Sequence, residues 1–314
     1  MTTILIASLQ PGEGRTAATA ALGALLAEQG KAVRLLRVRS QDEDAATAQD
    51  DARALASVPG CTAPASAVSA QDAQVQAREA DTSGAVCLIE APAGDAKDLA
   101  SALSAKVVLV SAQADALRLS DLTSAAGALG DALLGVIVTR QKERALTKVR
   151  DALAERNLMC LAVVPEDRLL AGPTIRELAE ALRASRLFDE APEDEAVEFV
   201  MIGPISSDPG QPYFLQHGHK AVVNRFDKMD LHLAALATEP DCLILTGGQQ
   251  PSPYFFDRVG GSGLEITVLL APEGTVRTVE QVDELYDRTR FSGRRKLERA
   301  IELFRQHADL ALLY

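Results

Sequence analysis

The sequence has no tryptophan, and only 4% of its 314 residues are aromatic. Its hydrophobic cores must therefore be built from aliphatic side chains, and hydrophobic residues make up 47% of the chain. No apolar run reaches the roughly 18 residues that a membrane-spanning helix needs. The amino terminus also lacks the basic and then apolar segments of a signal peptide. We therefore expect a cytoplasmic protein without a membrane segment.

Basic residues and cysteines are also scarce. With 32 Lys and Arg against 44 Asp and Glu, the formal net charge is −12. This charge argues against nucleic acid or an anionic membrane surface as the main partner. The four cysteines form no C-x-x-C pair. They are predicted to be buried free thiols, which agrees with a reducing cytoplasm.

The first sixteen residues predict a phosphate-binding loop. A short apolar run at 2–7 is followed by a glycine-containing turn and then by an Ala- and Leu-rich segment with helical spacing at 17–29. The backbone N–H groups of such a turn, together with the helix that follows, form a cradle for anions. The residues predicted to bind a nucleotide here are Gly12, Glu13, Gly14, Arg15 and Thr16.

This loop departs from the pattern G-x-x-x-x-G-K-[ST] at two positions. The first glycine position holds Leu9, and the lysine position holds Arg15. Arginine keeps the positive charge, but its planar guanidinium is larger than an ammonium group and is not equivalent to it. Two interpretations stay open at this point. The loop binds phosphate, or it is a strand–turn–helix corner that has kept its shape and lost its ligand.

Beyond the loop, apolar strand-like runs alternate with helical segments. This order predicts right-handed βαβ units and a parallel sheet, so the fold class is α/β. The acidic, proline-containing segment 189–198 is predicted to be a linker. It would separate a P-loop NTPase-like domain at 1–188 from a smaller α/β domain at 199–314.

The candidate metal ligands in the first domain are a hydroxyl and carboxylates. Glu90 ends the apolar run 85–90, and the carboxyl ends of parallel strands face the crevice where ligands bind in open sheets. The Thr16 hydroxyl could reach a metal ion bound to the phosphates, and Asp42 or Asp44 could support it. The alternatives are that Glu90 is a hydrogen-bonded strand-end carboxylate and that the aspartates form a solvated helix start.

Three loops of the second domain are predicted to form a further crevice or a subunit interface. Each follows an apolar strand-like run, so they would gather at one edge of the sheet. The alternative is that the aspartates cap a helix and the glycines only turn the chain. The residues concerned are Asp227, Lys228, Asp230, Thr246, Gly247, Gly248 and Thr275.

Several stretches in their order give the chain a specific resemblance. LIEAPAG at 88–94, LLGVIVT at 133–139 and VVPEDRLLAGPTIRELAEAL at 163–182 resemble dethiobiotin synthetase and the amino-terminal domain of long phosphotransacetylases. FDKMDLHLAAL at 226–236, LILTGG at 243–248 and EGTVRTVEQV at 273–282 resemble the DRTGG domain of those phosphotransacetylases. In this family the glutamate that matches Glu90 helps to bind magnesium, but here Ala91 and Pro92 alter the turn that follows it. The arginine of DRTGG falls on Lys228.

The resemblance implies a stand-alone relative of the regulatory half of these enzymes, without the acetyltransferase domain. We expect a regulatory or sensor protein that binds a nucleotide or another small anionic metabolite. The alternatives are an ATP- and Mg²⁺-dependent synthetase of the dethiobiotin synthetase type, or a scaffold with both sites vestigial. The resemblance also implies ATP and Mg²⁺ as cofactors and a homo-oligomer, most simply a homodimer.

Overall fold

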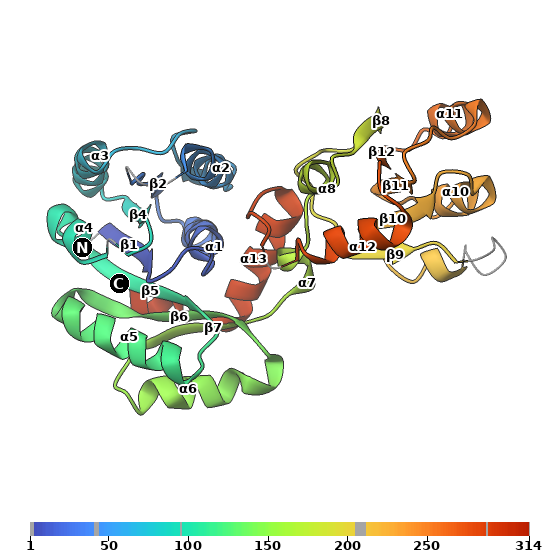
Figure 1. Cartoon of the computed structure of the whole chain (residues 1–314). Helices are drawn as coiled ribbons and strands as arrows, with labels where there is room; N and C mark the ends of the chain where they lie inside the picture. The colour runs from blue at the N-terminus through green and yellow to red at the C-terminus, as the bar shows by residue number, and fades with distance from the viewer. Residues whose placement is uncertain (1–2, 41–43, 95, 205–211, 287, 314) are drawn as a thin grey trace. The chain divides into compact units, whose positions relative to one another are not determined.

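The computed structural model describes residues 3–40, 44–94, 96–204, 212–286 and 288–313 (Figure 1). They form two compact units. The first comprises Met1–Asp167 together with Leu297–Tyr314, and the second comprises Arg168–Lys296. The predicted fold class is confirmed, because each unit is a sheet of mainly parallel strands connected by helices.

The first unit contains a seven-stranded sheet in which every pairing is parallel. The strand order is β3-β2-β4-β1-β5-β6-β7. Leu5 and Ala7 belong to a core that also holds residues of four helices, and the alternating residues Ile4 and Ile6 are buried as well. Both faces of β1 are therefore covered, as expected for a parallel sheet of aliphatic strands. The strands are β1 (Thr3–Ser8), β2 (Val33–Arg37), β3 (Cys61–Thr62), β4 (Val86–Glu90), β5 (Lys106–Ala112), β6 (Leu133–Gln141) and β7 (Cys160–Pro165).

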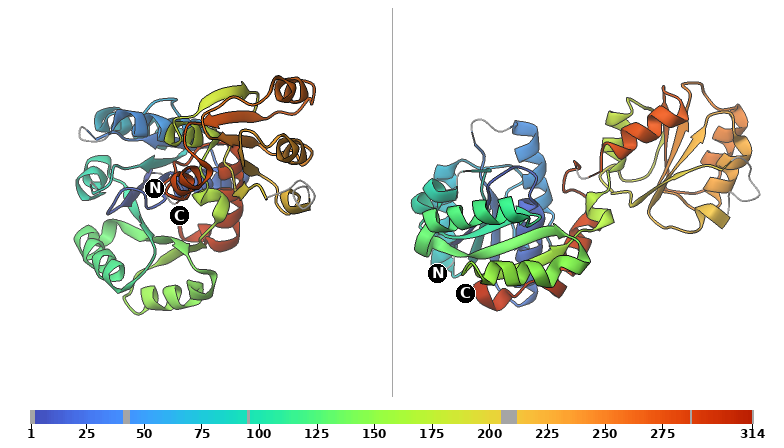
Figure 2. Two further views of the ribbon diagram at one scale, coloured as in Figure 1. Left: turned by 45° about the vertical axis from the view of Figure 1, so that its right-hand side comes forward. Right: turned by 60° about the horizontal axis from the view of Figure 1, so that its bottom comes forward.

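Three helices of the first unit, α2, α3 and α5, begin at residue types that favour helix starts. Asp44, Ser69 and Asp115 each accept hydrogen bonds from backbone N–H groups of the following turn. The helices are α1 (Arg15–Glu28), α2 (Ala45–Ala56), α3 (Ala70–Ser83), α4 (Ala96–Leu103), α5 (Ala116–Leu129), α6 (Leu146–Ala154) and α13 (Arg294–His307), with short turns η1 (Gly130–Ala132), η2 (Glu143–Ala145) and η3 (Leu310–Leu313). Figure 2 shows the arrangement from two further directions.

The second unit contains a five-stranded sheet in the order β8-β12-β11-β10-β9. The edge strand β8 pairs antiparallel with β12, and the remaining pairings are parallel. One core on each face holds the sheet against its helices. The strands are β8 (Ser185–Asp189), β9 (Phe199–Ile202), β10 (Lys220–Arg225), β11 (Cys242–Thr246) and β12 (Thr267–Ala271), and the helices are α7 (Arg168–Ala171), α8 (Ile175–Ala181), α10 (Met229–Leu236), α11 (Pro253–Gly260) and α12 (Thr275–Asp283).

This division differs from the predicted one at 189–198. Strand β8 is part of the second sheet, and Ala196 and Val197 are fully buried, so these small apolar residues anchor the acidic segment to the second unit. The carboxyl-terminal residues instead pack on the first unit. Phe304 is buried there, and Ala308 forms an antiparallel bridge with Ala162 of β7.

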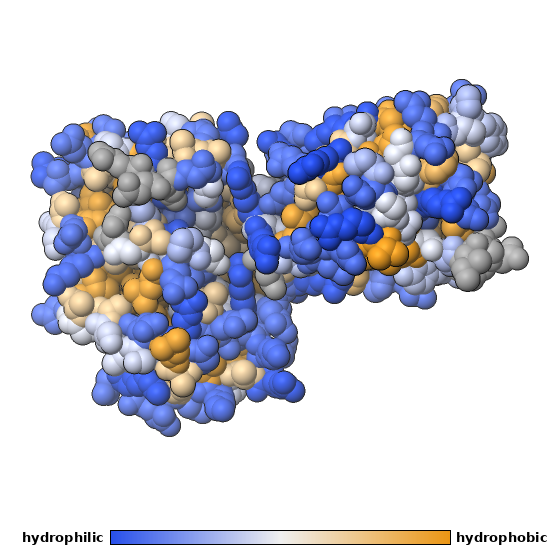
Figure 3. Space-filling model, in the orientation of Figure 1, coloured by the Kyte–Doolittle hydropathy of each residue, from blue (hydrophilic) through white to orange (hydrophobic). Residues whose placement is uncertain are grey.

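The visible face of each unit is covered mainly by hydrophilic residues, with apolar residues scattered among them (Figure 3). This distribution agrees with the charged fraction of 24%. In the part of the chain that the structure describes, none of the helices combines the length and apolar character needed to cross a membrane.

Candidate functional site

The loop between β1 and α1 has the backbone of a phosphate cradle. Gly12 and Gly14 have φ angles of 75° and 90°, in the left-handed region that favours glycine. Helix α1 begins at Arg15, and no side chain caps its amino terminus. The first N–H groups of a helix have no intrahelical acceptor, so they are available to bind an anion in front of the helix.

The register of three neighbouring strands brings a carboxylate to this loop. Glu90, the last residue of β4, lies opposite Ile6 of β1 and Arg37 of β2. The Thr16 hydroxyl donates to Glu90 Oε1 at 3.0 Å. Strand ends and the loop therefore meet as the sequence predicted, and Thr16 and Glu90 are in direct contact.

Two further charged residues complete this cluster, and sequence reasoning missed both. The Arg37 Nε atom is 3.1 Å from Asp51 Oδ2 and 3.4 Å from Glu90 Oε1. The Arg37 side chain is entirely buried, and Asp51 reaches it from α2. An arginine within the apolar run of β2 was the available signal, because an unpaired buried charge is rare in a parallel sheet.

Burial dominates the electrostatics of the two carboxyl groups. The pKa of Glu90 is raised to about 7, mainly by burial and also by the nearby Asp51, while Arg37, Arg15 and the Thr16 hydrogen bond oppose the increase. Burial also raises the pKa of Asp51, against the effect of Arg37. Near neutral pH the cluster therefore takes up or releases a proton more readily than ordinary carboxylates do.

Arg15, at the position of the P-loop lysine, makes a different contact from the one expected of that lysine. Its Nη1 atom donates to the backbone carbonyl of Ala91 at 2.8 Å, and the residue is only 8% exposed. Ala91 directly follows Glu90 in the altered turn. The guanidinium is thus held against the end of β4.

The Glu13 side chain forms hydrogen bonds within the loop that the sequence did not predict. The residue is 3% exposed, and its carboxylate accepts hydrogen bonds from backbone N–H groups of its own loop. The Thr139 hydroxyl donates to the Glu13 carbonyl at 3.0 Å, and this links the loop to β6.

The predicted metal ligands have different outcomes. Asp42 lies outside the described residues, and Asp44 caps α2. Within the described ranges, no group of three or more His, Cys, Asp or Glu side chains could hold a metal ion. Glu90 Oε2, however, is buried and has no hydrogen-bond partner. This oxygen, Asp51 and the Thr16 hydroxyl are donors that suit Mg²⁺ when phosphate oxygens supply the remaining positions.

In the second unit, two of the three predicted loops are in contact. The Thr246 and Thr275 hydroxyls form a hydrogen bond of 2.8 Å at the carboxyl ends of β11 and β12. The Gly247 and Gly248 N–H groups, however, donate to the carbonyls of Glu273 and Ala271. These bonds link the loop after β11 to the end of β12, so the two N–H groups are not available to a ligand.

The third predicted loop of the second unit, at 227–230, contains one member of a surface ion pair. Asp227 pairs with Arg225, and both side chains are well exposed. Lys228 occupies the N-cap position of α10, without a capping side-chain hydrogen bond, and Asp230 lies in the first turn. The predicted aspartate cap of this helix is therefore absent, and Lys228 is exposed near the sheet edge.

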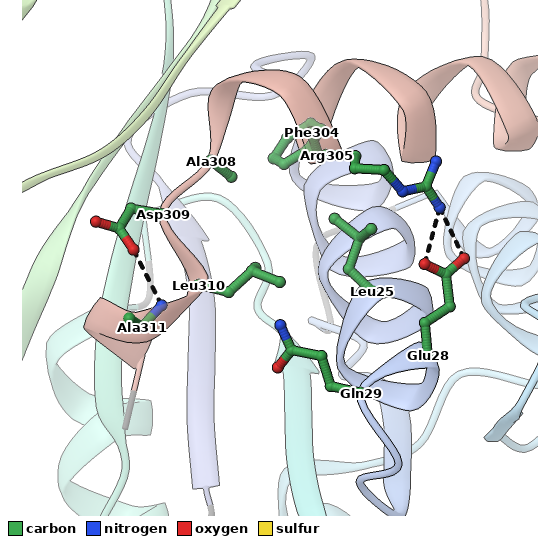
Figure 4. A pocket seen from close by; sticks show the side chains of 9 residues that line it. All are labelled: Leu25, Glu28, Gln29, Phe304, Arg305, Ala308, Asp309, Leu310 and Ala311. Atoms are coloured by element: carbon green, nitrogen blue, oxygen red, sulfur yellow. Dashed lines mark hydrogen bonds and ion pairs between the residues drawn. The ribbon is translucent and has the colours of Figure 1, made fainter.

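A cavity of about 520 Å³ lies at the other end of α1 from the phosphate loop. Figure 4 shows it between the carboxyl-terminal parts of α1 and α13. Arg305 pairs with Glu28 at 2.8 Å, and the Asp309 carboxylate accepts the Ala311 N–H at 3.1 Å. These charges are used in holding α13 and the following turn in place.

The fold, the glycine loop and the strand-end carboxylate together define a P-loop-type nucleotide-binding domain of the α/β class. The sequence profile of the CobQ/CobB/MinD/ParA nucleotide binding domain family matches residues 4–178, and the chain belongs to this family. The profile of the DRTGG domain matches residues 177–285. The predicted order of a P-loop domain followed by a DRTGG domain is thus confirmed.

Individual relatives agree with this assignment. A phosphate acetyltransferase of Nitratidesulfovibrio vulgaris is 28% identical over 161 residues, which cover 49% of this chain and 23% of that enzyme. The match therefore spans about a quarter of the relative's length.

Two solved structures match part of the chain. The MinC:MinD cell division complex of Aquifex aeolicus is 22% identical with a TM-score of 0.42, and the match covers 54% of this chain and 83% of that one. The CBS and DRTGG domains of a Clostridium perfringens pyrophosphatase, in complex with diadenosine tetraphosphate, are 11% identical with a TM-score of 0.33, and the match covers 47% and 72%.

Proposed function

We propose that this protein is a regulatory or sensor protein that binds a nucleotide or a related phosphorylated metabolite in the first unit. The observation that carries the proposal is the contact between Thr16 and Glu90 in front of the α1 amino terminus. The uncapped helix start supplies donors for a phosphate, and the orphaned Glu90 Oε2 supplies an acceptor for a cation beside it. Membership of a nucleotide-binding family supports this interpretation.

Mg²⁺ fits the same place. Thr16, Glu90 and Asp51 would hold the ion together with oxygens of the bound phosphates. When bound, the ion neutralises phosphate charge. The residues of this chain position it: Arg37 pairs with both carboxylates and keeps them facing the loop.

Arg15 favours binding over catalysis. In phosphoryl transfer, the P-loop cation stabilises charge on the transferred group. Here the Arg15 Nη1 atom donates to the Ala91 carbonyl, so part of that cation is engaged by the protein itself. We therefore propose that ATP hydrolysis by this protein is negligible.

An ATP- and Mg²⁺-dependent synthetase of the dethiobiotin synthetase type is the second candidate. It is favoured by one observation, the retention of the hydroxyl and carboxylate pair Thr16 and Glu90 beside a buried cation. Such an enzyme would require Arg15 to leave the Ala91 carbonyl and reach the transferred phosphoryl.

The second unit supports a regulatory role through its DRTGG domain. We propose that the edge formed by Thr246, Thr275 and Lys228 contacts a small anionic metabolite or a second copy of the chain in a homo-oligomer. The paired hydroxyls and the exposed cation support this proposal, and the two glycines serve the turn.

The test is a calorimetric titration of the full chain with ADP and ATP, with and without Mg²⁺. We expect nucleotide binding that is strengthened by Mg²⁺. Thr16→Val should weaken the Mg²⁺-dependent binding by about tenfold, because the hydroxyl is lost. Thr19→Val is the matched control, since the Thr19 hydroxyl donates only to the Arg15 carbonyl one turn away.

ATP turnover separates the two candidate functions. We expect a rate far below the enzyme-like value of about 1 s⁻¹. A rate at or above this value that disappears in Glu90→Gln would establish the synthetase instead. Absence of binding for both nucleotides under all conditions would remove the synthetase and nucleotide binding by the sensor.

A further inference from the structure

The side chain of Glu13 turns back into the phosphate loop. Its Oε2 atom accepts the backbone N–H groups of Leu9 and Gln10, both at 3.1 Å. The left-handed conformations of Gly12 and Gly14 on either side allow the loop to wrap around this carboxylate. A protein carboxylate therefore occupies donors at the beginning of a loop whose backbone N–H groups normally bind anions.

Arg118 of α5 fixes the other oxygen of the same carboxylate. Its Nη1 atom is 3.1 Å from Glu13 Oε1, and its Nη2 atom donates to the side-chain oxygen of Gln10 at 2.7 Å. The backbone N–H of Arg118 is itself bonded to Asp115, the N-cap of α5. Glu13 thus has three donors and a buried position, as expected of a fixed charge.

The remaining loop donors lie at the other end, where α1 begins. The N–H groups of the first turn, from Arg15 onward, have no acceptor within the helix. A phosphate bound there has the Glu13 carboxylate as its neighbour within the same loop. Each additional phosphate group adds negative charge, and like charges in a buried site repel each other.

We propose that Glu13 is a built-in anion that makes the loop select ligands with a short phosphate chain. One or two phosphate groups fit at the start of α1. A third phosphate group is repelled by the Glu13 carboxylate, and the Leu9 and Gln10 N–H groups that could bind it are already bonded to Glu13. This inference rests on the proposed function and adds to it the class of ligand: mono- or diphosphates in preference to triphosphates.

The experiment uses inorganic pyrophosphate and tripolyphosphate, because these compounds test the phosphate chain without a base. Calorimetric titration of the full chain should show tighter binding of pyrophosphate by about tenfold. In Glu13→Gln this preference should disappear, because tripolyphosphate should bind about tenfold more tightly relative to pyrophosphate than it does in the wild type. The amide oxygen of glutamine can still accept the Leu9 and Gln10 N–H groups, so the loop keeps its hydrogen bonds.

Two further variants make the result independent of folding defects. Arg118→Gln keeps the Glu13 charge but removes its partner, so the preference for pyrophosphate should increase. Glu28→Gln is the matched control, since Glu28 pairs with Arg305 at the far end of α1 and should behave as the wild type. Thermal unfolding of each variant shows whether it is folded.

The outcomes separate this inference from the proposed function. Equal preferences in the wild type, Glu13→Gln and Arg118→Gln, with ADP still bound, would overturn the role of Glu13 and leave nucleotide binding intact. A failure of every variant to bind polyphosphates and nucleotides would overturn both.

Discussion

Arg37 and Glu90 lie directly opposite each other on neighbouring strands, and the Arg37 Nε atom is 3.4 Å from Glu90 Oε1. The same nitrogen is 3.1 Å from Asp51, and the guanidinium also donates to the Val38 carbonyl. One buried cation is thus shared by the buried carboxylate of Glu90 and the partly buried carboxylate of Asp51. Removing it leaves uncompensated negative charge in the interior of the first unit.

Arg37→Met should therefore be strongly destabilising. We expect a loss of about 3–5 kcal/mol in the free energy of unfolding, the range for removing one partner of a buried ion pair. Urea denaturation followed by circular dichroism measures it. Arg34→Met on the same strand is the control. Arg34 pairs with Glu79 at the surface, so this variant should lose less than about 1 kcal/mol of unfolding free energy.

Adding Asp51→Asn and Glu90→Gln to Arg37→Met should recover part of the lost unfolding free energy, because the uncompensated carboxylates are removed. Similar losses for both single arginine variants would contradict the shared-cation arrangement.

The pH dependence of the second unit should reflect His232. Burial lowers the pKa of His232, while the hydrogen bond to the Phe226 carbonyl and the charges of Asp230 and Asp227 oppose the decrease. The unfolded chain then binds the proton more tightly than the folded protein, so stability is present above the ordinary value of 6.5 and is lost as the pH falls below it.

His232→Gln should remove this dependence, because glutamine can still donate to Phe226 and does not titrate. Between pH 7.5 and 5.5 the wild type should lose more unfolding free energy than the variant. The difference should be at most about 1.4 kcal/mol per pH unit. If the unfolding free energies of the two proteins change equally over this range, protonation of His232 does not determine the pH dependence, and the prediction is wrong.

Gly247 should tolerate no side chain. Its φ angle is 101°, and a Cβ atom would lie 3.0 Å from the Phe226 ring. Gly247→Ala should cost about 1–3 kcal/mol through backbone strain and displacement of the ring. Gly218→Ala is the control, because a Cβ atom there meets nothing within 4 Å and the φ angle is ordinary. A melting temperature of Gly247→Ala equal to that of the control would show that the turn is not under this constraint.

The parts of the site that follow from local order were predictable. A glycine turn between an apolar strand and a helix placed Thr16, and the end of an apolar strand placed Glu90. The structure brings these two side chains together because parallel strands end at one edge. The order of a P-loop domain and a DRTGG domain was predicted from the resemblance to long phosphotransacetylases.

The parts that depend on long-range side-chain geometry were not predictable. Asp51 reaches Arg37 only because α2 turns that face of the helix toward β2, and helix phase is fixed by packing. Glu13 was expected to contribute its backbone, and the turn of its side chain depends on Arg118, 105 residues later. The boundary at 189–198 missed the buried Ala196 and Val197, because the charges around them dominate the composition.

The return of α13 to the first unit has a consequence for the order of assembly. Phe304 and Leu303 are buried in the first unit, and the backbone N–H of Asp309 donates to the Leu161 carbonyl at the edge strand β7. On the ribosome, the strands of the amino-terminal sheet emerge long before these residues exist. The whole of Arg168–Lys296 is synthesised in between. The second unit is therefore complete as a nascent chain before the first, and the first unit receives α13 only after the second unit has been synthesised.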